Sequence, residues 1–286
     1  MLKKVDTGIP YQRLLKDIIY SLLFLRGMNI QDTLKAFMTA LRFLSNVLRG
    51  QHDDNHFFFL LSDVGIKYLC WRTFRYKVLL RTSRPADFFV IRPDYEKFVK
   101  KYFKPKSGDI VVDIGAHIGT YTLIAAKRVK QKGRVLAIEP DPENFRQLLL
   151  NISLNKIRNV IPVCAAVADI DGSTAFFVSK EKTGSSIARI PEKLEGIIIV
   201  PTVKLDTIVD KFALSRIDWL KIDVEGGEAL VLRGASKTLE ITRRLIIEVW
   251  PKNEREVYNI LRRYGFKIRA ITSTSSSSII NVMAER

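Results

Sequence analysis

The sequence predicts an α/β fold in which a mostly parallel β-sheet is covered by helices on both faces. From residue 110 onward, short runs that are apolar throughout alternate with helical patterns. Strands that are apolar on both sides belong to sheets buried on both faces, and the helices between them are the crossovers that parallel strands need. Two of these strands end in glycine-containing turns that carry acidic residues, so candidate ligand-binding groups lie at the carboxyl edge of the sheet.

The composition is that of a globular protein of 286 residues, 47% hydrophobic and 27% charged. It excludes a wholly disordered chain, a collagen and a coiled coil. The two cysteines, Cys70 and Cys164, form no CxxC pair or Cys/His cluster, which excludes a disulfide framework and a structural zinc site. We therefore expect a cytoplasmic protein. No uncharged apolar run approaches the roughly 18–20 residues that span a bilayer, and the N-terminal residues lack the features of a signal peptide.

The net charge of +17 predicts attraction to anionic partners. Residues 1–104 hold 19 basic and 9 acidic residues, so the excess is concentrated in the first third of the chain. Nucleic acid, an acidic membrane surface and phosphorylated substrates all fit a positive field, and a generally basic surface gives the same count. Charge alone does not choose among them.

Residues 1–84 are expected to form a basic, α-helical N-terminal extension. Apolar residues recur at helical spacing over residues 11–26 and 32–49, and Asp32 or Thr33 is the expected cap of the second helix. The polar faces carry basic side chains, namely Arg13, Lys16, Lys35, Arg42 and Arg49. The helices either pack as a hairpin on the rest of the protein, which we favour, or make peripheral contact with an anionic membrane.

The remaining residues, 85–286, are expected to form the α/β domain. Before the sheet begins, short aromatic and β-branched runs predict strands at residues 76–80 and 88–91, and a helix is expected at residues 95–103. The expected strands of the sheet are residues 110–114, 134–138, 160–164, 219–224, 244–250 and 266–271. The expected helices are residues 120–129, 143–155, 228–238 and 254–264. Residues 172–204 interrupt this alternation and predict a β-hairpin insertion.

The sharpest motif is a buried strand that ends in Asp113 and opens into a glycine turn before the next helix. The turn reads Gly115-Ala116-His117-Ile118-Gly119. Such a turn lets the backbone approach a nucleotide-like ligand closely. Its Gly-x-x-x-Gly spacing differs from the Gly-x-Gly-x-x-Gly spacing of NAD-binding proteins.

A second acidic residue, Glu139, follows the next strand, 26 residues after Asp113. A carboxylate there can accept hydrogen bonds from both hydroxyls of a ribose, so the two acids frame one adenosine. Pro140 is placed to pack against the adenine ring, although a proline at this point also ends the strand.

A third strand carries Lys221, Asp223 and Glu225 at alternate positions before another glycine turn. Alternate side chains of an extended segment leave on the same side. Three ionisable groups on one face near the carboxyl end of a strand favour a functional site over a structural ion pair.

In combination these motifs resemble the FkbM family of S-adenosylmethionine-dependent methyltransferases, over about residues 85–270. The residues that carry the resemblance are Asp113 to Gly119, Glu139-Pro140 with Asn144, Leu205-Asp206, and Lys221 to Gly226 with Glu228. The resemblance implies a class I methyltransferase fold, which is Rossmann-like with a seven-stranded, mostly parallel sheet. It also implies S-adenosylmethionine as cofactor and methylation of a hydroxyl oxygen on sugars or polyketides.

The resemblance also implies roles for single residues. Those around the methionine part of the cofactor are Asp113, Gly115, Ala116 and Gly119. Glu139 resembles the ribose clamp, and Asp223 with Glu225 resembles the catalytic strand end. Ser185 and Ser186 match a Gly/Ser loop that the family often carries in its insertion.

The chain departs from the family pattern at two positions. His117, which we count with Pro140 among the cofactor-binding residues, stands where Asn is usual. Trp250 stands where a His often follows the Ile-Glu-Val strand, so a base expected there is absent.

Methyl transfer to an alcohol needs alignment and removal of a proton. Asp223 is the leading candidate for the base, Glu225 is the alternative, and Lys221 completes the predicted catalytic group. We assign no metal, although a divalent ion held by these acids and Glu248 would also lower the pKa of the acceptor hydroxyl.

We therefore expect an O-methyltransferase that acts on a sugar, a glycan or a lipid-linked small molecule. We expect it in the cytoplasm, with a peripheral position at the membrane as the open alternative. One alternative is an RNA methyltransferase, which the charge favours, although no RNA-binding module is legible in residues 1–84. The other is a non-enzymatic basic adaptor that kept a nucleotide-binding fold, which the intact acids disfavour.

Overall fold

The computed structural model describes residues 25–27, 29–48, 68–72, 76–84, 86–180, 184–273 and 279–286. The chain divides into two compact units, residues 1–95 and 96–286. The expected boundary after residue 84 stays a prediction. Among the helices within these ranges, none is long and apolar enough to cross a bilayer.

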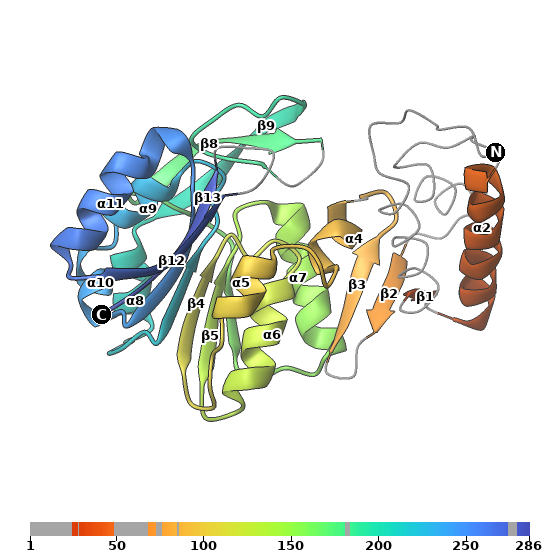
Figure 1. The fold of residues 1–286 in the computed structure, drawn as a ribbon, viewed down its shortest axis with the longest axis horizontal. Helices are drawn as coiled ribbons and strands as arrows, with labels where there is room; N and C mark the ends of the chain where they lie inside the picture. Colours follow the sequence, from red (N-terminus) through yellow and green to blue (C-terminus); the bar gives the residue numbers. More distant parts are fainter. Residues whose placement is uncertain are drawn as a thin grey trace. The chain divides into compact units, whose positions relative to one another are not determined.

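The larger unit is built on the predicted seven-stranded sheet, in the order β12-β13-β11-β10-β4-β5-β6 (Figure 1). Its strands are β4 (Ile110–Ile114), β5 (Arg134–Ile138), β6 (Val160–Val163), β10 (Trp219–Ile222), β11 (Arg244–Val249), β12 (Lys267–Ser273) and β13 (Ile280–Glu285). The five strands from β11 to β6 are parallel, and β13 runs antiparallel to both of its neighbours. The predicted fold class is confirmed.

Helices cover both faces of this sheet (Figure 1). One face is covered by α5 (Lys97–Tyr102), α6 (Thr120–Val129) and α7 (Pro142–Leu154). The other is covered by α8 (Leu205–Lys211), α9 (Glu228–Arg233), α10 (Ser236–Ile241) and α11 (Glu254–Arg263), which follows the short 3-10 turn η1 (Pro251–Asn253). Val111 and Trp219 pack with the first group, and Val112 and Leu220 with the second. A slip of one residue would exchange every buried side chain, so the two cores fix the register.

The helix predicted over residues 228–238 is divided at Gly234 into α9 and α10. A Cβ at Gly234 would lie 2.1 Å from the carbonyl oxygen of Ala168, so the backbone passes too closely for any side chain. The carboxylate of Asp206 caps α10 by accepting hydrogen bonds from the N–H of Thr238 at 2.8 Å and from its hydroxyl at 2.7 Å. This aspartate therefore joins α8 to α10.

The predicted β-hairpin insertion is confirmed. It consists of β8 (Gly172–Ser179) and β9 (Leu194–Val203), which pair antiparallel, and the short β7 (Ala166–Val167), which pairs parallel with β9. Phe176, Val178 and Val200 form its small core.

The smaller unit contains an antiparallel sheet of β1 (Leu25–Gly27), β2 (Tyr68–Arg72) and β3 (Lys77–Arg81), with helices α2 (Ile30–Leu48) and α4 (Ala86–Ile91). Most of the helix predicted over residues 11–26 lies outside the described residues. Its last two positions form part of β1 instead, because they pair with β2. The cap of α2 is Asn29, whose Oδ1 accepts a hydrogen bond from the N–H of Asp32 at 2.8 Å.

The strand predicted at residues 88–91 is wrong, because these residues belong to α4. An apolar run of four residues does not distinguish a strand from a buried helix. The helix is fixed by tertiary contacts. Asp87 accepts two hydrogen bonds from the Arg81 side chain at 2.7 and 2.9 Å, and Phe88 packs edge-on against Trp71 at 5.7 Å.

Candidate active site

The carboxyl end of β4 holds a fully buried carboxylate. Asp113 Oδ2 accepts a hydrogen bond from the Thr122 hydroxyl at 2.6 Å. Its Oδ1 has no hydrogen-bond partner within the described ranges and lies 3.7 Å from Lys221 Nζ. Burial raises the pKa of Asp113, and the charge of Lys221 opposes that rise. A buried oxygen with unused acceptor capacity is the kind of group that a bound ligand satisfies.

The turn after β4 needs glycine at both ends. Gly115 has φ 76°, and a Cβ there would lie 1.8 Å from the carbonyl oxygen of Asp223. Gly119 has φ 94°, and a Cβ there would lie 2.6 Å from Leu148 Cδ1. The N–H groups of Gly115 and Ala116 both donate to the carbonyl of the last residue of β5 at 3.0 Å. The turn is therefore fixed between β5, α7 and the end of β10.

Glu139 leaves β5 beside this turn, as predicted. Its carboxylate accepts hydrogen bonds from the N–H of His117 at 2.8 Å and from the N–H of Asp141 at 3.0 Å. Burial raises the pKa of Glu139 to about 7, although both hydrogen bonds lower it. His117 has the left-handed φ of 52°, and Pro140 next to Glu139 is half-buried. The structure thus brings the predicted cofactor-binding residues together at the ends of β4 and β5.

The end of β10 places a buried lysine between two carboxylates. Lys221 lies opposite Asp113 in the register of β10 with β4. Its Nζ donates a hydrogen bond to Asp223 Oδ2 at 3.0 Å. Burial alone would lower the pKa of Lys221, but the charges of Asp223 and Asp113 raise it above the ordinary value. Lys221 is therefore a fixed cation that holds the two carboxylates in place.

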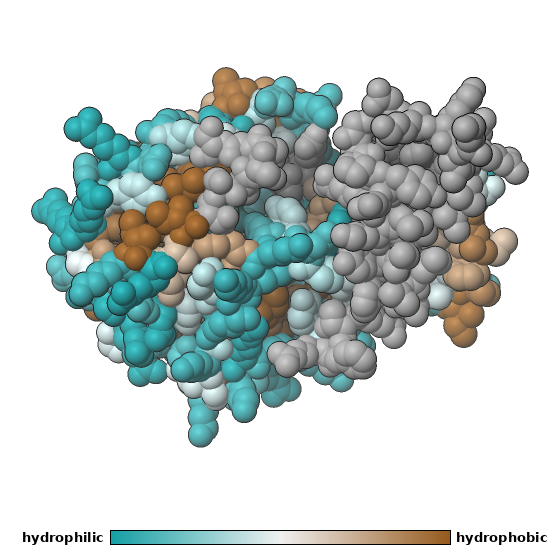
Figure 2. Space-filling model, viewed as in Figure 1, coloured by the Kyte–Doolittle hydropathy of each residue, from teal (hydrophilic) through white to brown (hydrophobic). Residues whose placement is uncertain are grey.

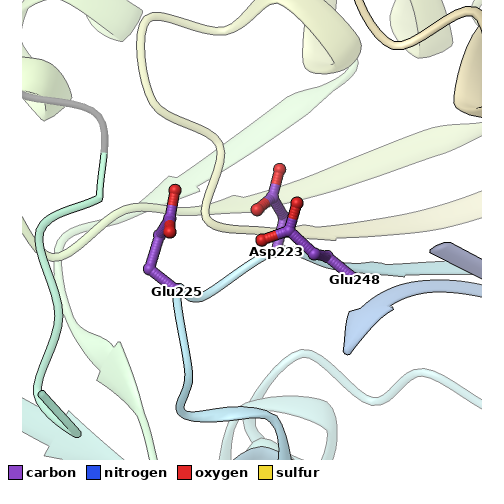
Figure 3. A group of neighbouring side chains, drawn as sticks. All are labelled: Asp223, Glu225 and Glu248. Carbon is purple, nitrogen blue, oxygen red and sulfur yellow. The ribbon is translucent and has the colours of Figure 1, made fainter. Parts of the chain in front are cut away.

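Three carboxylates converge beyond the ends of β10 and β11 (Figure 3). Asp223, Glu225 and Glu248 each place an oxygen within 4.8 Å of the other two. Burial, followed by the charge of Asp223, raises the pKa of Glu225 to about 7 and that of Glu248 well above its ordinary value. Like charges at this separation resist simultaneous ionisation, so the charge of Asp223 favours the protonated forms of Glu225 and Glu248. The predicted pair of Asp223 and Glu225 is thus brought together.

Glu96, directly before α5, adds a further carboxylate that sequence reasoning missed. Its Oε2 is buried and has no hydrogen-bond partner within the described part of the chain. Burial, followed by the charge of Asp223, raises the pKa of Glu96 to about 6. No local pattern marks this residue, because only the packing of α5 on the sheet brings it to the site.

Arg189 was also missed, and it reaches the acids from the insertion. Its Nη2 lies 3.3 Å from Glu225 Oε2, and its guanidinium lies 4.2 Å from the ring centre of Trp250. The Trp250 indole donates in turn to Glu248 Oε1 at 3.3 Å. Arg189 Nε is buried and donates no hydrogen bond to the residues the structure describes. Trp250, at the family's histidine position, therefore supports Glu248 and Arg189.

The loop that carries Arg189 is held by its serines. Ser185 Oγ accepts a hydrogen bond from the N–H of Ser179 at 2.9 Å, and Ser186 Oγ accepts one from the N–H of Ala188 at 3.0 Å. The two serines of the Gly/Ser loop thus hold the backbone of the loop that carries Arg189.

Glu228 fixes the turn that carries Glu225. Glu225 has φ 54° and Gly226 has φ 99°. Glu228 Oε1 accepts a hydrogen bond from the N–H of Gly226 at 2.7 Å, and Asn253 Nδ2 donates to the carbonyl of Gly226 at 2.8 Å and to Glu228 Oε2. These contacts hold a left-handed backbone that a glutamate would otherwise rarely adopt.

The three carboxylates are also a donor set for a hard divalent cation. Lys221 already neutralises Asp223, and Arg189 pairs with Glu225. Two of the three carboxylates therefore have a cationic partner. That the site holds no metal stays a prediction.

Residues 113–268 match the family model of the methyltransferase FkbM domain. The chain belongs to the FkbM methyltransferase family. A hexuronic acid methyltransferase from Haloferax volcanii is 28% identical over 141 residues, which are 49% of this chain and 56% of that relative. A 31-O-demethyl-FK506 methyltransferase from Streptomyces tacrolimicus is 27% identical over 199 residues, 58% of this chain and 75% of that relative. The chain therefore spans about half the length of the first relative and three quarters of the second.

Among solved structures, the fibrillarin of Aeropyrum pernix with natively bound S-adenosyl-L-methionine is similar. It is 13% identical, and the match covers 77% of this chain and 94% of that chain with a TM-score of 0.43.

Residues 113–268 are therefore an FkbM methyltransferase domain, built on the seven-stranded α/β sheet. The residues present fit S-adenosylmethionine. Asp113 Oδ1, which lacks a hydrogen-bond partner in the described residues, suits the cofactor's ammonium, and the glycine turn leaves backbone free of side chains beside it. Glu139 accepts hydrogen bonds from the N–H groups of His117 and Asp141 and from the Asn144 side chain, and a carboxylate with about four acceptor sites keeps capacity for a ribose hydroxyl.

Proposed function

We propose that this methyltransferase methylates a hydroxyl oxygen on a sugar, a glycan or a lipid-linked small molecule. The observation that carries the proposal is the carboxylate group of Asp223, Glu225 and Glu248 at the strand ends. Transfer to a hydroxyl releases a proton, and a carboxylate beside the acceptor is suited to receive it.

S-adenosylmethionine supplies the methyl group on a positively charged sulfur. The chain's own residues align the acceptor and take its proton. We give this role to Asp223, because its backbone lies against the turn at Gly115 and Lys221 fixes its carboxylate. As the new carbon–oxygen bond forms and the carbon–sulfur bond breaks, the hydroxyl proton passes to the Asp223 carboxylate. Glu225, with a pKa of about 7, is the next acceptor in the group.

The acceptor side of the site is bordered by the insertion. Arg189 and Trp250 form a stacked pair beside Glu225. An indole face and a guanidinium suit the apolar face and the hydroxyls of a sugar ring. The names of the two relatives, which specify a hexuronic acid and a demethylated FK506, support an oxygen-bearing small-molecule acceptor.

The test is to follow label from methyl-labelled S-adenosylmethionine into fractionated cell extract with purified protein. We expect label in glycan or lipid, and none with Asp223→Asn. Alkaline hydrolysis then separates the products, because a methyl ether survives it and a methyl ester releases methanol. Label that is released by alkali, or that becomes soluble only after ribonuclease treatment, would contradict the proposal.

A further inference from the structure

Helix α2 presents its large apolar side chains to solvent. Among its described side chains, the buried ones are small: Ala36, Thr39 and Ala40. The exposed ones include five large apolar residues with exposed fractions between 41% and 79%, namely Ile30, Leu34, Phe37, Met38 and Leu41. A helix that packs by its apolar face shows the opposite arrangement.

These five residues, called the α2 stripe below, form one continuous surface. At 100° per residue their positions fall within an arc of about 100°, and they extend along about 16 Å of helix. Figure 2 shows apolar surface along α2. An exposed apolar surface of this kind marks an interaction site.

Two cations flank the α2 stripe. Lys35 and Arg42 are exposed and seven residues apart, so they lie on the same side of the helix. Asp32, in the first turn, is the one acidic residue in the sequence of α2. The whole chain carries a net charge of +17. A partner surface that complements the α2 stripe is therefore apolar and carries negative charge at its edge.

We propose that α2 docks this protein on the surface of an anionic membrane. The α2 stripe lies among the acyl chains, and Lys35 and Arg42 reach the acidic headgroups with their long side chains. A second copy of the chain fits less well, because a symmetric interface would bring the same cations together. The docking is independent of which hydroxyl the enzyme methylates.

The experiment is co-sedimentation of the full chain with vesicles of phosphatidylcholine, with or without phosphatidylglycerol. We expect binding to the anionic vesicles and release as salt rises. Phe37→Gln with Leu41→Gln should weaken partitioning about tenfold for each apolar side chain withdrawn. Lys35→Gln with Arg42→Gln should weaken it about fivefold for each charge. Ile199→Gln, which removes an exposed isoleucine of β9, is the matched control and should bind like the wild type.

Several outcomes would overturn the docking. One is no sedimentation with anionic vesicles at low salt, and another is equal binding to neutral vesicles. A lower melting temperature for the Phe37/Leu41 variant would show that the α2 stripe is packed inside the protein. A wild-type dimer that this variant dissociates, measured by light scattering, would assign the surface to a second copy. Calorimetry with S-adenosylmethionine on the same samples keeps a failure of docking distinct from a failure of the enzyme.

Discussion

Replacing Asp223 with Asn removes one negative charge and keeps the shape of the side chain. The nearest consequence falls on Lys221, whose Nζ loses a partner at 3.0 Å and keeps Asp113 at 3.7 Å. Breaking a buried ion pair outright costs about 3–5 kcal/mol. Because Asp113 remains and the Asp223 side chain is 24% exposed, we expect a loss of about 1–2 kcal/mol of folding free energy. The variant should stay folded.

Methyl transfer by Asp223→Asn should fall by about 10²–10⁴, the range for a missing general base. Cofactor affinity should remain close to that of the wild type, because the residues predicted to bind the ribose and the methionine part are Glu139 and Asp113. The assay is the initial rate from labelled S-adenosylmethionine, with calorimetric titration of the cofactor and a thermal melt on the same preparation.

Asp210→Asn is the matched control for this substitution. It breaks an exposed Asp–Lys pair with Lys237, at 3.1 Å. Such a pair contributes at most about 1 kcal/mol, and turnover should not change. Near wild-type turnover in Asp223→Asn, together with a large loss in Glu225→Gln, would refute the assignment and make Glu225 the base.

Four further outcomes follow from the site and its supports. Turnover should rise with pH around pH 7, because the raised pKa of Glu225 leaves it protonated below that value, and the rise should disappear in Glu225→Gln. Glu139→Gln should weaken S-adenosylmethionine binding by about 1.5–3 kcal/mol in calorimetry, since a charged acceptor for the ribose is lost. Asp206→Ala should lower the free energy of unfolding by about 2–3 kcal/mol and leave turnover per folded molecule unchanged. Burial opposes the shift, but hydrogen bonds from Thr238 lower the pKa of Asp206. The contribution of Asp206 to the free energy of unfolding is therefore present above pH ~4 and fades as the pH falls further. Thermal melts in acid would show this loss. Glu248→Gln should melt no lower than the wild type, because burial raises the pKa of Glu248 and so favours the neutral form that Gln resembles. Chelation of divalent ions should leave turnover of the wild type unchanged, and a loss of activity on chelation would indicate a metal.

The central strands and their first crossover were predictable to the residue. β4, α6 and β5 have the bounds that the sequence indicated. Here the apolar runs are short and complete, and glycines punctuate both ends of the turn, so local signals and tertiary packing agree. The predicted cofactor-binding residues could be placed at the strand ends for the same reason, since each lies at a defined distance from a strand end, and their role stays a prediction.

The remaining elements depend on contacts that are distant in sequence. The seventh strand, β13, is inserted between β11 and β12, and its residues, Ile280–Glu285, follow a run of serines that reads as a turn. Glu96 reaches the site from the start of α5, about 130 residues before the end of β10. Arg189 reaches it from the insertion, about 35 residues before the same strand end. Neither segment carries a local pattern, because the site that defines their role exists only in the folded chain.

The charge of the site links folding to the catalytic cycle. Burial, together with the charge of Asp223, raises the pKa values of Glu96, Asp113, Glu225 and Glu248, while Lys221 and Arg189 supply the paired cations. Such an excess of buried negative charge works against folding, so it is expected where a ligand compensates it. When bound, S-adenosylmethionine would add a positive sulfur at this edge of the sheet and offset part of that negative charge. Methyl transfer would remove the charge of the sulfur while the hydroxyl proton neutralises one carboxylate, so the net charge of the site would become more negative only when that proton leaves for solvent.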